Sequence, residues 1–190
     1  MEVNKQPVDI IILTYHRLPY LKELVWMIKE RTEYPYRLIV VDNRSRDGTK
    51  RWIKKMHRKG EIWKYVFMKR NEYMTNAFAE GFKKVESDLF IVTQDDVIPP
   101  ETKPCWLTRM VELIKNNKEY VSISMGYRNI SFERHLCEQF GGFKMKNEID
   151  LIARYASACG RIQRKDDFTR FVNNERYRNG KTTGESHSYG

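Results

Sequence analysis

Short apolar runs alternate along the chain with segments whose apolar positions recur three or four residues apart. Runs of this kind are typical of strands buried on both faces, which the sequence predicts at residues 8–15, 37–42, 63–68 and 89–94. The segments between them predict amphipathic helices, the first of which opens at Leu18-Pro19. Strands that alternate with helices pair in parallel. The sequence therefore predicts an α/β fold with a mostly parallel, Rossmann-like sheet covered by helices.

The second half of the chain has a weaker pattern. A helix is expected around residues 107–114, and a fifth strand at residues 120–125. Gly141-Gly142 is interpreted as a break before a further helix at about residues 147–159. The polar stretch 172–190 has few apolar anchors, so we expect it to be a flexible tail.

The net charge of the chain narrows its possible partners more than its overall composition does. The 190 residues carry 35 Lys and Arg against 25 Asp and Glu, a formal net charge of +10. Such an excess favours anionic partners, namely nucleotides, nucleic acid or an acidic membrane surface, without choosing among them. No apolar run reaches the roughly 20 residues of a membrane span, and the first residues lack the apolar stretch of a signal peptide. Three widely spaced cysteines form no metal or redox motif, so we expect a cytoplasmic protein with reduced thiols.

Two adjacent carboxylates, Asp95 and Asp96, follow the apolar run 89–94. The carboxyl ends of parallel strands meet at one edge of a sheet, so these carboxylates should lie near Thr14 and Asp42. Buried carboxylates are costly unless they are paired or bind a cation, and oxygen ligands suit Mg²⁺ or Mn²⁺. The alternative is that both are ordinary turn residues.

Four segments resemble glycosyltransferase family 2, whose fold is called GT-A. Residues 10–17 are similar to the family's opening strand, which ends in P/L-T-Y-N-R. Residues 40–49 are similar to its V-V-D-D/N-x-S-x-D-G-T, a specific match because many residue types coincide in one loop. Residues 71–81 resemble its N-x-G…A-x-N-x-G helix, with Tyr73 in place of the first Gly, and residues 93–96 stand where the family has D-x-D.

The resemblance is good over about residues 8–126, and it implies a single GT-A domain at residues 1–171. Within that domain it implies a nucleotide-binding half at residues 1–100 and an acceptor half at residues 101–171. The expected tail at residues 172–190 would follow.

The resemblance also implies an activity, the inverting transfer of a sugar from a UDP- or GDP-linked donor to the hydroxyl of a glycan, protein or lipid. The residues that it implies for donor binding are Thr14, Tyr15, Arg17, Asp42, Asn71 and Asp95. Asp96 aligns with the metal ligand of D-x-D, and Asp95 would share Mn²⁺ or Mg²⁺ with it. Gln94 replaces the motif's first Asp, so the division of roles between the two carboxylates stays open.

Two loop carboxylates have a structural alternative to ligand binding. Asp42 would accept a hydrogen bond from the nucleotide base, or it would anchor its own loop as an Asx turn. Asp47 is predicted to cap the following helix rather than to touch the donor.

The general base is implied by a segment further along the chain. In the family, G-G-F precedes E-D-x-D-L, and here Gly141-Gly142-Phe143 precedes residues 147–151. Glu148 falls on the position of the base and Asp150 on the second acid, and either carboxylate could serve. The alternative is a helix N-terminus enriched in acidic residues. Asp166-Asp167 is a weaker candidate, because it lies in a basic segment.

Other function classes remain open. A nucleotidyltransferase would usually carry a Gly-rich phosphate loop after the first strand, and residues 14–19 contain no Gly. A non-catalytic protein that binds nucleotide or nucleic acid would use the basic surface, and an inactive glycosyltransferase fold would bind donor without transferring it. The acceptor site could be shallow, or it could be completed by a second copy of the chain or by peripheral contact with an acidic membrane.

Overall fold

The computed structural model describes residues 5–118, 120–131, 134–144, 160–167 and 169, with the backbone alone at 126–131 and 134–144. The helices are α1 (Leu18–Arg31), α2 (Thr49–Arg58), α3 (Tyr73–Phe82) and α4 (Trp106–Asn116). The strands are β1 (Val8–Thr14), β2 (Tyr36–Asp42), β3 (Lys64–Phe67), β4 (Leu89–Gln94), β5 (Val97–Ile98), β6 (Tyr120–Ser131), β7 (Arg134–Lys144) and β8 (Arg161–Arg164).

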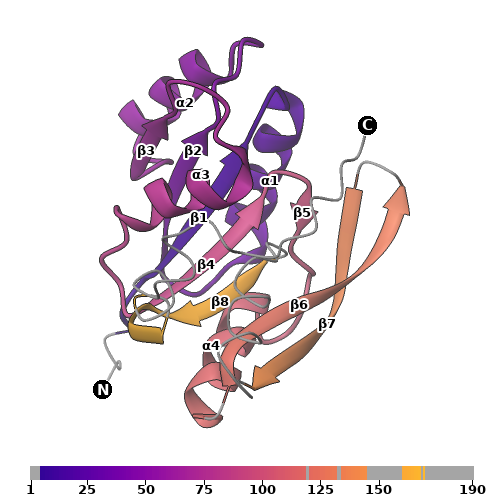
Figure 1. The fold of residues 1–190 in the computed structure, drawn as a ribbon. Coiled ribbons are helices and arrows are strands. Elements are labelled where there is room, and N and C mark those ends of the chain that lie inside the picture. Colours follow the sequence, from indigo (N-terminus) through magenta and orange to yellow (C-terminus); the bar gives the residue numbers. More distant parts are fainter. Residues whose placement is uncertain (1–4, 119, 132–133, 145–159, 168, 170–190) are drawn as a thin grey trace.

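All eight of these strands belong to one sheet, in the order β3-β2-β1-β4-β8-β6-β7-β5 (Figure 1). The first four strands are parallel, and β8 pairs antiparallel with both β4 and β6. The strand order reverses between β1 and β4, because β2 and β3 lie on one side of β1 and β4 on the other. A reversal of this kind leaves a crevice at the carboxyl ends of the strands, which is where open α/β sheets bind ligands.

The register of the strands brings the predicted site residues to that edge. Thr14 at the end of β1 pairs with Asp42 at the end of β2, and Leu13 pairs with Gln94 at the end of β4. Asp95 then continues the line, with its backbone N–H donating to the carbonyl of Leu13 (3.2 Å).

Helices cover the sheet on both faces. The apolar sides of α1, α2 and α4 pack with alternate residues of the parallel strands, including Ile10 and Ile12, in the larger core. The intervening residues Ile11 and Leu13 face the other way and pack against α3 in a second core. This alternation explains why β1 reads as a continuous apolar run, because both of its faces are buried. None of the helices in the described part of the chain is long and apolar enough to cross a membrane.

The parallel half of the sheet and its helices confirm the predicted α/β fold. The α3 helix overlaps residues 71–81, where the sequence resembles the family's helix motif. The interpretation of Gly141-Gly142 as a break was wrong. Both glycines lie inside β7, paired with Ser124 and Ile123 of β6, so the neighbouring strand outweighs their low intrinsic strand propensity.

Three strands, β5, β7 and β8, were not predicted. The β5 strand has only two residues, and β8 reads Arg-Ile-Gln-Arg, which carries little strand signal until β4 and β6 flank it. The expected helix at 147–159 and the expected tail at 172–190 lie outside the described residues.

Candidate functional site

A cluster of two carboxylates, a hydroxyl and a guanidinium lies where β1 and β4 end. The hydroxyl of Thr14 donates to Asp95 Oδ2 (2.6 Å), and Arg17 Nη1 donates to Asp96 Oδ2 (2.8 Å). The same Arg17 nitrogen lies 3.9 Å from Asp95 Oδ1. A single cationic side chain, itself 48% exposed, therefore faces both carboxylates.

Burial raises the pKa of Asp95 to about 7. The Thr14 hydrogen bond and the Arg17 charge oppose this shift, while the neighbouring charge of Asp96 adds to it. A carboxyl that is so costly to ionise gains free energy from any cation brought next to it. The chemistry of the pair therefore favours binding of a further cation.

Asp42 is fully buried, and its two oxygens have different surroundings. Its Oδ1 accepts a hydrogen bond from the backbone N–H of Ser45 (2.9 Å), which holds the loop after β2. Its Oδ2 has no hydrogen-bond partner among the residues described by the structure. A buried acceptor without a partner costs about 1–3 kcal/mol, so the site retains one oxygen that a donor group on a ligand could satisfy.

Asp47 joins the start of α1 to the start of α2. One of its oxygens accepts from the backbone N–H of Leu18 (3.0 Å), and the other accepts from the N–H (3.2 Å) and the hydroxyl (2.6 Å) of Thr49. Burial acts to raise its pKa, but these hydrogen bonds outweigh burial and hold the pKa below its usual range. Asp47 therefore accepts from the backbone N–H of the first residue of both helices, although Gly48 rather than Asp47 stands at the N-cap of α2.

Asn71 stabilises the loop that precedes α3. Its side-chain oxygen accepts from Asn43 Nδ2 (2.7 Å) and from the backbone N–H of Tyr73 (3.0 Å). Tyr73 has a left-handed backbone (φ 58°) and is 81% exposed. A glycine adopts this conformation without a steric penalty, so the residue that replaces the motif's first Gly keeps the backbone shape that a Gly would favour.

Sequence reasoning missed several residues that hold these loops together. The side-chain oxygen of buried Asn43 accepts a hydrogen bond from the backbone N–H of Glu72 (3.0 Å), and the hydroxyl of Ser45 accepts one from the backbone N–H of His16 (2.8 Å). Asn and Ser side chains in a strand-to-helix loop often form hydrogen bonds with nearby backbone groups. The presence of these two residue types was the one sign in the sequence that could have predicted their role. Tyr15 was predicted to contact the donor; its ring is 43% exposed and lies edge-on to that of His16.

The carboxylate pair fits a hard divalent cation only in part. Within the described residues, no three His, Cys, Asp or Glu side chains are grouped closely enough to hold a metal ion. Asp95 and Asp96 supply two carboxylates, and Mg²⁺ in proteins is commonly held by one or two carboxylates together with substrate phosphates and water. Gln94, which replaces the first Asp of D-x-D, donates through Nε2 to the sulfur of Met74 (3.3 Å).

Both candidates for the general base, Glu148 and Asp150, lie outside the described residues, so the structure does not place them relative to the carboxylate pair. The weaker candidate Asp167 lies 3.6 Å from Nη1 of Arg164, the last residue of β8, in an ion pair three residues apart in the sequence. That contact agrees with its interpretation as part of a charge-paired surface.

Comparison with known proteins gives a family match and structural neighbours. The family model described as glycosyl transferase family 2 matches residues 9–171. A dolichol-phosphate mannosyltransferase of Pyrococcus furiosus is 30% identical over 125 residues, which cover 65% of this chain and 33% of that protein. The chain therefore spans about a third of the length of this relative.

Two solved structures show the same fold at low identity. A mannosyltransferase from Pyrobaculum calidifontis, in complex with GDP-Man and Mn²⁺, has a TM-score of 0.58 at 20% identity, over 66% of this chain and 37% of its own. Residues 1–349 of S. aureus TarS, in complex with UDP-GlcNAc, have a TM-score of 0.60 at 13% identity, over 84% and 46%. Both likenesses bear on the fold alone.

Proposed function

Because the chain belongs to glycosyl transferase family 2, we propose that it transfers a sugar from a nucleoside diphosphate sugar to an acceptor hydroxyl. The observation that carries the proposal is the carboxylate pair at the switch point of the sheet, where Asp95 and Asp96 lie beside Thr14 and Arg17. Anionic side chains so placed favour binding of a cation together with the phosphates that the cation neutralises.

In this proposal the donor lies along the carboxyl edge of the sheet. Asp42 Oδ2 accepts a hydrogen bond from the base, which gives a partner to its otherwise unsatisfied buried oxygen. Tyr15 is exposed and offers a ring face near the base and ribose, while Thr14 and Asn71 fix the loops around them. Arg17 is half exposed, so it can turn from the carboxylates toward the diphosphate.

Asp95 and Asp96 would hold Mn²⁺ or Mg²⁺, with Asp96 as the more accessible ligand. When bound, such an ion supplies charge neutralisation for the departing nucleoside diphosphate. Inversion at the anomeric carbon requires a base on the acceptor side, and we assign that role to Glu148 or Asp150. The acceptor would be a glycan, protein or lipid.

The relatives leave the donor base open. The Pyrobaculum protein is in complex with GDP-Man and TarS with UDP-GlcNAc. A panel of donors therefore has to include both bases.

The test is calorimetric titration of the protein with UDP and GDP, in buffer with Mn²⁺, with Mg²⁺ or with EDTA. We expect one of the two nucleotides to bind, and the metal to tighten binding at least tenfold. Asp96→Asn should remove the effect of the metal, whereas Asp88→Asn, at an exposed aspartate away from the site, should not. The proposal fails if neither nucleotide binds under any of the three conditions.

A further inference from the structure

The positive charge of the molecule is concentrated on one helix and the loop before it. Residues 44–59 contain eight Lys and Arg and a single acid, Asp47, a formal charge of +7 out of +10 for the chain. The inward face of α2 packs into the core through Ile53 and, in part, through Trp52 and Met56. The cations therefore occupy its outward face.

In the part of the chain that the structure describes, the cations of α2 form no ion pair with an acidic side chain. Ion pairs on other elements include Lys29–Glu61, Lys64–Glu86 and Lys83–Glu80. Within the described residues no ion pair involves Lys50, Arg51, Lys54, Lys55 or Arg58. The neighbours of Lys50 and Lys54 are aromatic instead, since both ammonium groups lie over the ring of Phe67.

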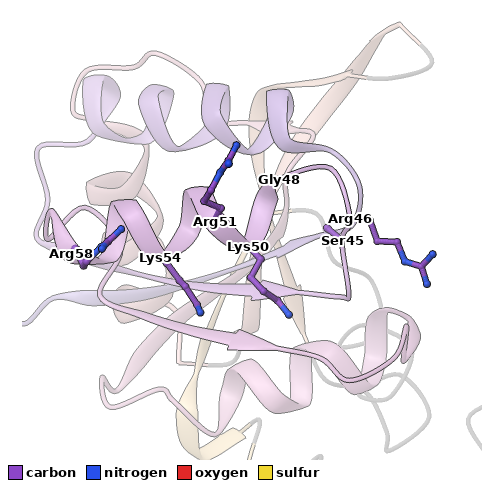
Figure 2. Close-up of a pocket in the computed structure, with 7 residues that line it drawn as sticks. All are labelled: Ser45, Arg46, Gly48, Lys50, Arg51, Lys54 and Arg58. Atoms are coloured by element: carbon purple, nitrogen blue, oxygen red, sulfur yellow. The ribbon is translucent and has the colours of Figure 1, made fainter.

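These side chains line a hollow of about 630 Å³. The residues that line it are Ser45, Arg46, Gly48, Lys50, Arg51, Lys54 and Arg58, all from α2 and the loop before it (Figure 2). The hollow therefore runs along one helix and is not an enclosed cavity. We call these lining residues the α2 strip, or basic strip. One end of the strip is the loop that follows Asp42, so it starts beside the candidate donor site.

An exposed indole lies on the neighbouring helix. Trp26 of α1 is 56% exposed, which is unusual for so large an apolar side chain. Lys29, one turn later on the same face of α1, donates to Glu61 just after α2 (2.7 Å). Trp26 therefore lies on the side of α1 that faces the C-terminal end of the basic strip.

We propose that the α2 strip, together with Trp26, docks the protein on an anionic phospholipid surface. A broad array of unpaired cations without enclosing walls matches a planar array of lipid phosphates better than a single small anion. Tryptophan prefers the boundary between headgroups and acyl chains, which favours a bilayer over nucleic acid or an acidic glycan. The docking is peripheral, because the apolar face of α2 is already buried in the core.

The test is sedimentation of the full chain with phospholipid vesicles. We expect binding to vesicles with about a third of phosphatidylglycerol, little binding to pure phosphatidylcholine, and loss of binding as salt is raised. Replacing Lys50, Lys54 and Arg58 by Gln should weaken the partition coefficient at least tenfold. Replacing Lys69, Lys83 and Lys84 by Gln removes the same charge from exposed positions before and after α3, which packs on the other face of the sheet from α2, and should weaken the partition coefficient less than threefold.

A second measurement follows Trp26 directly. Vesicles should shift the tryptophan emission of the wild type to shorter wavelength, and Trp26→Ala should lose most of that shift while keeping its circular dichroism. Equal losses from the two triple variants, or equal binding to neutral vesicles, would overturn the proposal. It would also be overturned if the protein bound a single-stranded oligonucleotide more tightly than the anionic vesicles at the same salt concentration, since the strip would then be a nucleic-acid site.

Discussion

The two carboxylate oxygens of Asp42 have different surroundings, so the turn interpretation and the ligand-binding interpretation concern different oxygens. One oxygen anchors the loop through Ser45, as an Asx-type turn would. The other is buried and has no partner within the described part of the chain, as a ligand-binding oxygen would be before its ligand arrives. The residue type alone could not separate these roles, because they depend on which lone pairs the fold leaves unused.

Arg17 occupies the position next to both carboxylates that a cation would take. We therefore expect Arg17→Ala to bind Mn²⁺ more tightly than the wild type in the absence of nucleotide, by about fivefold, because a partly exposed ion pair contributes up to about 1 kcal/mol. Titration with Mn²⁺ followed by electron paramagnetic resonance measures this directly. Lys22→Ala removes an exposed charge from the same helix and should leave the affinity unchanged; weaker binding by Arg17→Ala would show that the arginine does not compete for the pair.

Asp47 makes a prediction about pH. Its pKa is lower in the folded protein than its ordinary value of 3.8, so its stabilising effect is present above about pH 3.8 and is lost as the pH falls below that value. Asp47→Asn should therefore be less stable than the wild type at pH 7, with a gap that narrows below about pH 3.8. Urea unfolding at pH 7 and pH 3 provides the measurement, with Asp88→Asn as the control. A gap of equal size at both values would mean that the charge of Asp47 is irrelevant.

At the scale of elements, periodicity was a reliable guide where one side of a helix or both faces of a strand meet the core. The buried positions of α1, Leu21, Leu24, Val25 and Ile28, follow the predicted helical spacing. It failed for β7 and β8, whose residues form strands because strands distant in sequence pair with them. When the pairing strand comes from a distant segment, the residues of the strand itself carry little pattern from which it could be predicted.

Gly81 in α3 is an element-scale feature that the motif signalled without giving its reason. A Cβ at this position would lie 2.7 Å from Ile11 Cγ2 and 2.8 Å from Val41 Cγ2, both on buried, β-branched residues that have little freedom to move. The glycine therefore sets how closely α3 approaches β1 and β2.

Gly81→Ala should destabilise the protein by about 1–2 kcal/mol, because overpacking outweighs the better helix propensity of alanine. Chemical denaturation monitored by circular dichroism measures the change. Thr75→Ala, at an exposed position of the same helix, should be neutral or slightly stabilising. A stable Gly81→Ala variant would mean that α3 can move outward at little cost.

At the scale of the whole molecule, the order of elements predicted the edge where the site residues meet. Parallel strands with helical crossovers leave their carboxyl ends together, so Thr14, Asp42 and Asp95 could be grouped from the sequence before any contact was known. The contacts themselves could not be predicted. The Arg17 bridge, the Asn43–Asn71 pair and the hydrogen bonds of Asp47 to both helices depend on side-chain rotamers and loop paths that spacing does not encode.

The carboxylate that Asp47 shares between α1 and α2 has a consequence for the entropy of recognition. Because one carboxylate holds the first turns of both α1 and α2, the loops that precede those helices lose their freedom when the chain folds rather than when a ligand arrives. A ligand that enters between them is therefore spared much of the ordering cost that mobile loops would impose, commonly about 0.5–1.5 kcal/mol for each immobilised side chain. Folding would thus already have supplied part of the ordering that a ligand bound there requires.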